Sequence, residues 1–315
     1  GINKKKIVFS GVGKTASELD FAIKKKILLI NTESESEIDE IEKIAKKKKV
    51  KVDIGIRLNP DIDAETLKQI STGKEENKFG VNKKKFIYLI NKLRNSKFIN
   101  IKCLSVHIGS QILNYKAYVR MLKVVSNIIE KSNYKFEFID LGGGMGIQYE
   151  LKNKKFEYKK YNQAIKKFNN KYKAKIIFEP GRSIIGNTAI LASKVIYKKE
   201  AKSKIFIILD VAMNDLIRPA LYNARHRIIP EKKNKSLSKK NYEFVGPICE
   251  TTDKFATYKN FQNLKQGDII GICDVGAYGF SLSSNYNVRA KPAEILVDSK
   301  KTFLIRKREK LERLV

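Results

Sequence analysis

The 315-residue chain has no tryptophan, only three cysteines and only six prolines. Cys103, Cys249 and Cys273 show no CxxC spacing and do not suggest a disulfide framework. Cysteine usage of this kind is typical of a reducing compartment, so we expect a cytoplasmic protein. We also expect no metal site.

Long hydrophobic runs are missing as well. No apolar stretch approaches the roughly 20 residues that a membrane-spanning helix needs. The sequence also has no pattern typical of a signal peptide. We therefore expect a soluble protein with no membrane partner.

Acidic residues are scarce: 33 Asp and Glu stand against 65 Lys and Arg, which gives a formal net charge of +32. Net charge alone would suit a polyanion such as a nucleic acid. The lysines, however, are spread in short runs such as 4–6, 46–49 and 83–85, and no basic stripe is interleaved with aromatic residues. We therefore favour a lysine-rich solvated surface and expect no nucleic-acid partner.

Two periodicities divide the chain, with the change near Asn187. In residues 1–187 short apolar strands alternate with helical patterns, which predicts a parallel sheet with right-handed crossovers. In residues 188–315 short strands rich in β-branched residues predict an antiparallel β-domain. The predicted strands are 7–10, 27–31, 52–58, 103–108, 136–141, 175–178, 189–197, 205–211, 242–245, 268–273 and 293–305. The predicted helices include 16–25, 35–47, 84–94, 115–130 and 161–172, and 230–241 is a predicted loop.

The strands of the first half all run into polar or glycine-rich residues. Functional side chains at the carboxyl ends of parallel strands are how a (β/α)8 barrel of the TIM type builds its active site. We therefore predict such a barrel for residues 1–187. A barrel needs eight strands and six are predicted, and two units of roughly 30 residues amount to ~60 residues. We expect the first strands to be missing from this chain, or the barrel to be completed by something else.

The stretch IIFEPGRS, residues 176–183, ends a predicted strand with an acid, a proline, a glycine and an arginine. Gly181 lets backbone N–H groups approach an anion, Glu179 offers a carboxylate, and Arg182 offers a planar fork of donors. An ordinary turn explains these residues equally well when they are taken alone.

Three further motifs of the first half follow predicted strands. His107, beside Gly109 and Ser110, is either a platform for a flat ring or a satisfied core histidine. The glycines of LGGGMG, residues 141–146, suit a phosphate held by backbone N–H groups. SGVGKT, residues 10–15, resembles a phosphate loop but lacks a required glycine, so a nucleotide triphosphatase is disfavoured.

The second half contributes candidates of a different kind. GPICE, residues 246–250, places the Cys249 thiol beside the Glu250 carboxylate, although a buried structural cysteine is the simpler alternative. Tyr278 lies in a glycine-flanked loop where its hydroxyl can meet a phosphate. Arg218 and Tyr222 are four residues apart, as on one helical turn. Neither Arg182 nor Arg218 has an acid at helical spacing, which leaves both for a ligand carboxylate.

Taken together, nine motifs resemble those of the diaminopimelate decarboxylases. That family belongs to the pyridoxal-phosphate enzymes that combine an alanine-racemase-like barrel with a β-domain. The resemblance runs from Ile7 to the carboxyl terminus in the family's order. It implies the decarboxylation of meso-diaminopimelate to L-lysine and CO2, the last step of lysine biosynthesis. The motifs are FSGVGK, NTESESE, IRLNPDIDA with STGKEENKFG, VHIGSQI, DLGGGMGI, EPGRSIIGN, MNDLIRPALY, GPICE and DVGAYGFSLSSNYN.

The resemblance also implies how the cofactor, pyridoxal 5'-phosphate, is held. His107 would stack on its ring, and the Glu179 carboxylate would pair with its pyridine nitrogen, which makes the ring an electron sink. Its phosphate would be held by groups of Ser110, Gly144, Glu179, Pro180, Gly181 and Arg182.

The implied substrate is a small amino acid that carries charge at both ends. Its distal carboxylate would bind Arg182, Arg218 and Tyr222, and its distal ammonium would bind Glu250. Tyr278 would touch both cofactor and substrate, and Cys249 would supply the proton that replaces CO2. In the family Cys249 and Glu250 enter from the partner subunit, so the resemblance implies a homodimer.

One feature of the family has no counterpart in this sequence. The lysine that binds the cofactor lies in a motif like YAxKAN, which is absent, and Lys14 is a poor substitute because it opens a predicted helix. We therefore expect the amino-terminal part of the enzyme to be missing and this chain alone to have little activity. A decarboxylase of ornithine or arginine, and a catalytically inactive regulatory partner of an intact paralogue, remain as alternatives.

Overall fold

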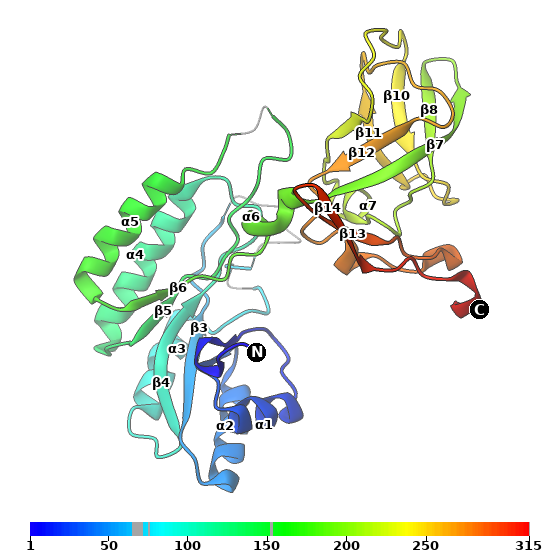
Figure 1. Ribbon diagram of the computed structural model, residues 1–315. Helices are drawn as coiled ribbons and strands as arrows, with labels where there is room; N and C mark the ends of the chain where they lie inside the picture. The colour runs from blue at the N-terminus through cyan, green and yellow to red at the C-terminus, as the bar shows by residue number, and fades with distance from the viewer. Residues whose placement is uncertain (65–71, 75, 152–153, 315) are drawn as a thin grey trace. The chain divides into compact units, whose positions relative to one another are not determined.

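The chain divides into two compact units in the computed structural model, which describes residues 1–64, 72–74, 76–151 and 154–314 (Figure 1). Unit 1 comprises Gly1–Gly146 and Lys155–Pro180, and unit 2 comprises Ile147–Lys154 and Gly181–Val315. The predicted domains 1–187 and 188–315 stay a prediction. Ser71 and Glu75 of the STGKEENKFG motif lie outside the described residues. Within these residues no helix is long and apolar enough to cross a membrane.

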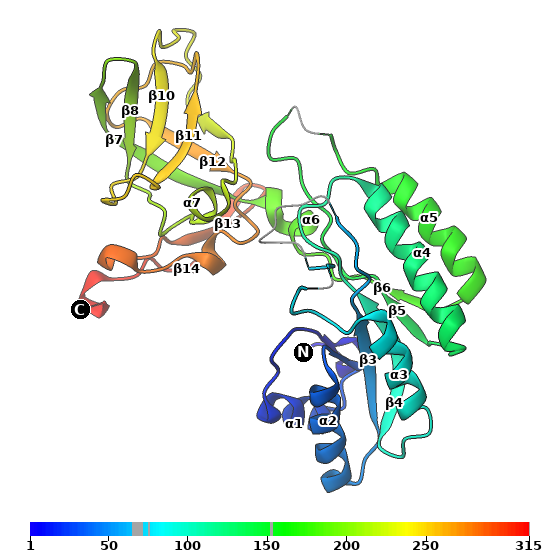
Figure 2. The same ribbon diagram turned by 180° about the vertical axis from the view of Figure 1, so that it is seen from behind.

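Unit 1 contains a six-stranded parallel sheet in which the strands follow one another in chain order. The sheet is curled, and Figures 1 and 2 show its helices along the outer side. The prediction of barrel-type β/α units is therefore confirmed, with six strands. The strands are β1 (Val8–Phe9), β2 (Leu29–Thr32), β3 (Val52–Leu58), β4 (Ile99–Val106), β5 (Phe138–Asp140) and β6 (Lys175–Ile177). The helices are α1 (Ala16–Lys25), α2 (Glu35–Lys48), α3 (Lys83–Leu93), α4 (Tyr115–Ser132) and α5 (Tyr158–Tyr172).

Local sequence explains where these helices begin. The side chains of Thr15, Ser34, Asn82 and Asn114 each accept a backbone N–H in the first turn of the helix that follows. Thr15 also forms a capping box with Glu18. The apolar face of each helix packs on the sheet, as in α4, where Tyr118, Met121 and Val125 are buried. This core fixes the strand ends that carry the polar residues.

Unit 2 contains a second six-stranded sheet in the order β11-β10-β8-β7-β12-β9 and a separate two-stranded sheet. Its strands pair antiparallel except β8 and β10, which are parallel because the connection between them crosses over. Two short helices, α6 (Arg182–Ile185) and α7 (Arg218–Tyr222), accompany the sheets. The strands are β7 (Ile190–Glu200), β8 (Lys204–Leu209), β9 (Ile228–Pro230), β10 (Asn241–Val245), β11 (Lys254–Tyr258), β12 (Ile269–Cys273), β13 (Glu294–Asp298) and β14 (Lys301–Arg306).

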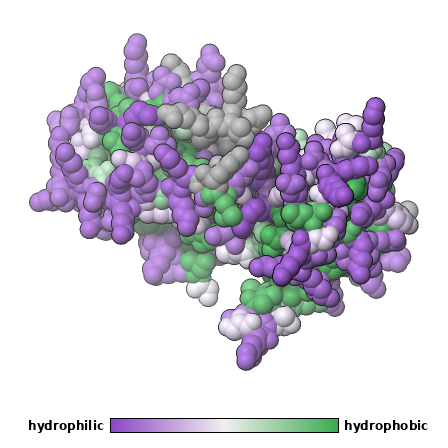
Figure 3. All heavy atoms as spheres, turned by 90° about the horizontal axis from the view of Figure 1, so that it is seen from above, coloured by the Kyte–Doolittle hydropathy of each residue, from purple (hydrophilic) through white to green (hydrophobic). Residues whose placement is uncertain are grey.

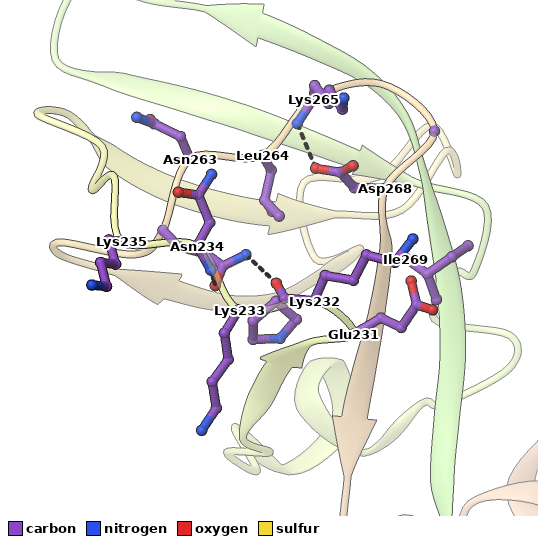
Figure 4. Close-up of a pocket in the computed structure, with 13 residues that line it drawn as sticks. Glu231, Lys232, Lys233, Asn234, Lys235, Asn263, Leu264, Lys265, Asp268 and Ile269 are labelled. Carbon is purple, nitrogen blue, oxygen red and sulfur yellow. Dashed lines mark hydrogen bonds between the residues drawn. The ribbon is translucent and has the colours of Figure 1, made fainter.

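The surface is strongly polar. Figure 3 shows hydrophilic side chains over most of the visible face, with smaller hydrophobic patches between them. In unit 2 a cavity of about 710 Å³ is rimmed by Lys232, Lys233, Lys235 and Lys265. Figure 4 shows these lysines beside Asn234 and Asn263, and none of the predicted site residues lines this cavity.

Candidate active site

A glycine turn after β5 joins two of the predicted site residues in unit 1. The N–H of Gly143 donates to Nδ1 of His107 at 3.1 Å. The N–H of Glu179, which follows β6, donates to the carbonyl of Gly142 at 2.9 Å. His107 and Glu179 thus flank one turn at neighbouring strand ends, as the alternation of strands and helices predicts.

The turn needs glycine because neighbouring backbone approaches it closely. A Cβ on Gly142 would lie 2.7 Å from Nδ1 of His107, and one on Gly143 would lie 2.0 Å from the carbonyl oxygen of Glu179. A Cβ on Gly144 would lie 2.0 Å from the carbonyl oxygen of Gly109, next to Ser110, and Gly144 has φ +87°. Glycine-rich backbone at the ends of parallel strands is what a bound phosphate requires, so the turn fits the phosphate of the cofactor.

His107 is neutral. Its Nδ1 accepts a hydrogen bond from Gly143, so the proton of the neutral ring lies on Nε2. Burial, together with the positive charge of Arg57, lowers the pKa of His107 to about 4. Arg57 is held nearby by a 2.7 Å ion pair with Glu33. An uncharged flat ring at this position suits stacking against an aromatic cofactor.

Glu179 belongs to a chain of polar side chains that the sequence did not single out. Its carboxylate accepts a hydrogen bond from the hydroxyl of Ser10. The side-chain amide of Asn31 donates to Ser10 Oγ at 3.1 Å and to Asp140 Oδ2 at 2.8 Å. Burial and the charge of Glu179 raise the pKa of Asp140 to about 7, and the N–H groups of Gly142 and Asn31 act against this rise. All four residues lie at or near strand ends, which is the signal that could have connected them.

Unit 2 holds two buried arginines around one aromatic ring. The guanidinium carbon of Arg182 lies 5.7 Å, and that of Arg218 4.8 Å, from the ring centroid of Tyr149. Arg182 Nη1 donates to the Tyr149 hydroxyl at 2.5 Å. Burial is the main cause that lowers the pKa of Arg218, and the charge of Arg182 lowers it further. Two neighbouring buried cations favour a bound anion, and a ligand carboxylate at both residues stays a prediction.

His226 holds Arg218 by a hydrogen bond. A guanidinium only donates, so His226 Nε2 accepts from Arg218 Nη1 at 2.7 Å, and the His226 proton lies on Nδ1. That Nδ1 donates to the carbonyl of Cys273 at 2.8 Å. Tyr149 and His226 also line a cavity of about 1030 Å³. The sequence analysis missed both residues, and no local motif distinguishes them.

Tyr278 and Tyr222 join the arginines in unit 2. The guanidinium carbon of Arg182 lies 4.9 Å from the ring centroid of Tyr278, a residue with φ +58°. A Cβ on Gly181 would lie 3.4 Å from the Tyr278 hydroxyl. Tyr222 ends helix α7, which Arg218 begins, as their spacing predicts.

Cys249 and Glu250 are exposed on a loop of unit 2. The Tyr286 hydroxyl donates to one oxygen of Glu250, and Thr252 Oγ1 donates to the other at 3.0 Å. The amide of Asn287 lies 3.8 Å from the Cys249 sulfur. The alternative of a buried structural cysteine is therefore wrong, and the thiol is accessible to solvent.

Lys14 has a structural role. Its ammonium, with a side chain only 2% exposed, lies 2.7 Å from a carboxylate oxygen of Glu37. It also donates to the carbonyls of Gly11 and Asn31 at 2.6 and 2.7 Å. These three oxygens match its three donors, in agreement with its rejection as the cofactor lysine. Among the described residues no group of three or more His, Cys, Asp and Glu is placed to hold a metal ion.

Comparisons with known proteins agree with this geometry. Residues 1–186 match the family model for the pyridoxal binding domain of pyridoxal-dependent decarboxylases. The chain is 42% identical, over its whole length and 76% of the relative, to diaminopimelate decarboxylase of Aquifex aeolicus. It is 40% identical to the crystal structure of the Helicobacter pylori enzyme complexed with L-lysine, with a TM-score of 0.92, covering 100% of this chain and 79% of the other. The M. jannaschii enzyme in co-complex with L-lysine is 33% identical, with a TM-score of 0.91 and coverages of 99% and 74%.

Proposed function

Because the chain belongs to the diaminopimelate decarboxylases, which are pyridoxal-phosphate-dependent carboxy-lyases, we propose that it acts on meso-diaminopimelate in the last step of lysine biosynthesis. The products are L-lysine and CO2. The observation that carries this substrate is the pair of buried arginines around Tyr149, because a second carboxylate is what distinguishes diaminopimelate from ornithine and arginine. An ornithine or arginine decarboxylase is less supported.

The residues that follow strands β4, β5 and β6 take the cofactor. When bound, pyridoxal phosphate supplies an electron sink for the carbanion left when CO2 departs. The neutral ring of His107 stacks on it, and the Glu179 carboxylate keeps its pyridine nitrogen protonated. Ser110, Gly144 and the backbone from Glu179 through Pro180 and Gly181 to Arg182 hold its phosphate.

The residues of unit 2 take the substrate. Arg182, Arg218 and Tyr222 bind the distal carboxylate, because buried guanidinium groups match it in charge and in geometry. Glu250 binds the distal ammonium, and Tyr278 contacts cofactor and substrate.

Cys249 gives a proton to the carbon that CO2 has left. Its thiol is exposed, and we infer that Cys249 and Glu250 serve the site of a second copy of the chain, so that the active unit is a homodimer. We place the enzyme in the cytoplasm.

The test is a binding comparison, because the arginine pair is proposed to act in substrate recognition. The chain is titrated with pyridoxal phosphate and then with meso-diaminopimelate, ornithine or arginine, and binding is followed by cofactor fluorescence. We expect diaminopimelate to bind at least about tenfold more tightly, since a charge-assisted contact contributes about 1.5–3 kcal/mol.

The arginine pair is tested by substitution. Arg218→Met should remove the preference for diaminopimelate and leave cofactor affinity unchanged. Arg225→Met is the matched control, because Arg225 lies near helix α7 but pairs on the surface with Glu150. Equal affinity for ornithine and diaminopimelate in the unaltered chain would refute the proposed substrate.

A further inference from the structure

We propose that Ser10, Asn31 and Asp140 are positioning residues that fix the carboxylate of Glu179 through a directed chain of hydrogen bonds. This hydrogen-bonded chain connects four strands of unit 1. Ser10 follows β1 and Asn31 lies in β2. Asp140 ends β5 and Glu179 follows β6. The inference rests on the proposed function, since it explains how Glu179 is held for the cofactor. Neither the family resemblance nor the sequence motifs assign these three residues a role.

The direction of the chain follows from the amide of Asn31. Its nitrogen has two hydrogens and only donates, one to Ser10 Oγ at 3.1 Å and one to Asp140 Oδ2 at 2.8 Å. Ser10 Oγ therefore accepts from Asn31, and its single hydrogen points to the Glu179 carboxylate. An oxygen of Asn31 in place of this nitrogen would compete with Glu179 for that hydrogen.

The amide is held in place from several sides. Asp140, at the far end, accepts the N–H of Gly142 at 2.9 Å through its other oxygen. The backbone carbonyl of Asn31 accepts from Lys14 at 2.7 Å. A Cβ on Gly55 of β3 would lie 2.0 Å from Asn31 Oδ1, so only glycine leaves room for the amide. Asn31 and Asp140 are fully buried, which makes reorientation of either side chain costly.

The hydrogen-bonded chain also connects the carboxyl groups of Glu179 and Asp140 through the neutral side chains of Ser10 and Asn31. Glu179 on the loop after β6 opposes ionisation of Asp140, whereas Arg57 of β3 favours it. The buried thiol of Cys103 on β4, whose pKa is raised well above its ordinary value, faces the same group and is neutral. A proton on Asp140 therefore removes the like charge that Asp140 would otherwise set against Glu179.

The experiment compares four variants of the full chain by cofactor affinity and by the pH dependence of cofactor fluorescence between pH 5 and 9. Ser10→Ala should weaken affinity about tenfold, and Ser10→Thr, which keeps the hydroxyl, should restore it. Asn31→Leu should weaken affinity similarly and shift the pH profile, because it uncouples Asp140 from Ser10.

The fourth variant, Thr32→Val, is the matched control. Thr32 is the buried neighbour of Asn31 on β2, and its hydroxyl donates to the Gly55 carbonyl at 2.9 Å outside the chain of Glu179. Thr32→Val should leave the cofactor affinity within about twofold and the pH profile of cofactor fluorescence unchanged, as expected when a neutral hydrogen bond remote from the ligand is lost. Circular dichroism of every variant checks that it is folded.

Three results would overturn the proposal: unchanged affinity in Ser10→Ala, no rescue by Ser10→Thr, or a loss in Thr32→Val equal to that in Asn31→Leu. Glu179→Gln separates this failure from failure of the proposed function. If Glu179→Gln weakens cofactor binding and the Ser10 and Asn31 variants do not, only the positioning chain is wrong. If Glu179→Gln has no effect, the assigned role of Glu179 is wrong as well.

Discussion

The proton of His226 lies on Nδ1, and its Nε2 accepts from Arg218. The contact with Arg218 requires the neutral ring, since a protonated Nε2 cannot accept, and a second proton would face the charges of Arg218 and Arg182. Burial, together with these charges, lowers the pKa of His226 to about 4, against the opposing effect of the Cys273 carbonyl. The same residue that orients Arg218 is therefore a source of acid instability.

The pH dependence follows from linkage. The unfolded chain protonates His226 near pH 6.5 and the folded chain near pH 4, so its contribution is fully present above pH 6.5 and is lost as pH falls through this window. A pKa difference of this size corresponds to roughly 3 kcal/mol when complete. His107 acts with the same sign, whereas Asp140, whose folded pKa is raised to about 7, destabilises the fold as pH rises from about 4 to 7.

We predict that His226→Gln reduces the loss of unfolding free energy as the pH falls below about 6.5. Glutamine keeps an oxygen that accepts from Arg218 and has no group that titrates in this range. Urea unfolding of both proteins at pH 7, 6, 5 and 4 should show a difference in unfolding free energy that changes by roughly 2 kcal/mol between pH 7 and pH 5. Because His107 and Asp140 are present in both proteins, their effects cancel in this difference. Parallel stability curves would show that His226 is not the group responsible.

At the scale of elements, the hydrophobic periodicity of the sequence predicted most strands and helices, because each of them is a continuous segment with its own apolar pattern. Helix α1 and strand β3 have the predicted bounds. The prediction of one strand over 293–305 was wrong, because the chain reverses at Ser299 with φ +55° and forms the β13–β14 hairpin. β9 and β11 were missed, since they are short and depend on pairing with β12 and β10.

The candidate site likewise combines residues that local sequence predicts with residues that depend on contacts between distant segments. Their positions after predicted strands indicated His107, Gly144 and Glu179 as site residues, because the carboxyl ends of parallel strands lie at one edge of the sheet. The contact between Asn31 and Asp140 joins residues 109 positions apart, and the contact between Arg218 and His226 depends on the turn after α7. No local motif encodes such contacts, so the supporting side chains became visible only in three dimensions.

The glycine turn after β5 permits a prediction about stability and cofactor binding. Gly144→Ala places a Cβ 2.0 Å from the carbonyl oxygen of Gly109 at φ +87°, so the turn and the β4 end must separate. We expect a loss of about 2–4 kcal/mol of unfolding free energy and weaker cofactor binding. Gly267→Ala is the matched control, because Gly267 has φ +88° with no atom within 4 Å of the added Cβ.

Denaturant unfolding and cofactor titration measure both variants. Gly267→Ala should cost only about 1 kcal/mol, which is the backbone strain alone, and should leave cofactor affinity unchanged. Equal losses in the two variants would mean that close packing at Gly144 contributes nothing.

At the scale of the whole molecule, the β13–β14 hairpin carries a cluster of exposed apolar side chains. Six large apolar side chains, three on each strand, are 47–67% exposed. A two-stranded sheet is marginally stable by itself, and exposed apolar patches of this kind mark interfaces. The six are Ile295, Leu296, Val297, Phe303, Leu304 and Ile305.

These side chains support the proposed homodimer, and the prediction is that a second copy of the chain covers the hairpin. Light scattering after size exclusion should give twice the 36.1 kDa of one chain. Leu304→Lys should shift the equilibrium to the monomer by at least about tenfold in Kd, because a charge replaces an apolar side chain that the dimer would bury.

Thr302→Lys is its matched control. Thr302 is exposed on the same strand but adds little apolar surface, so this variant should remain dimeric. A monomeric wild-type chain would contradict the homodimer itself. A dimer that Leu304→Lys leaves intact would place the interface on another surface, and the exposed hairpin would then need another explanation.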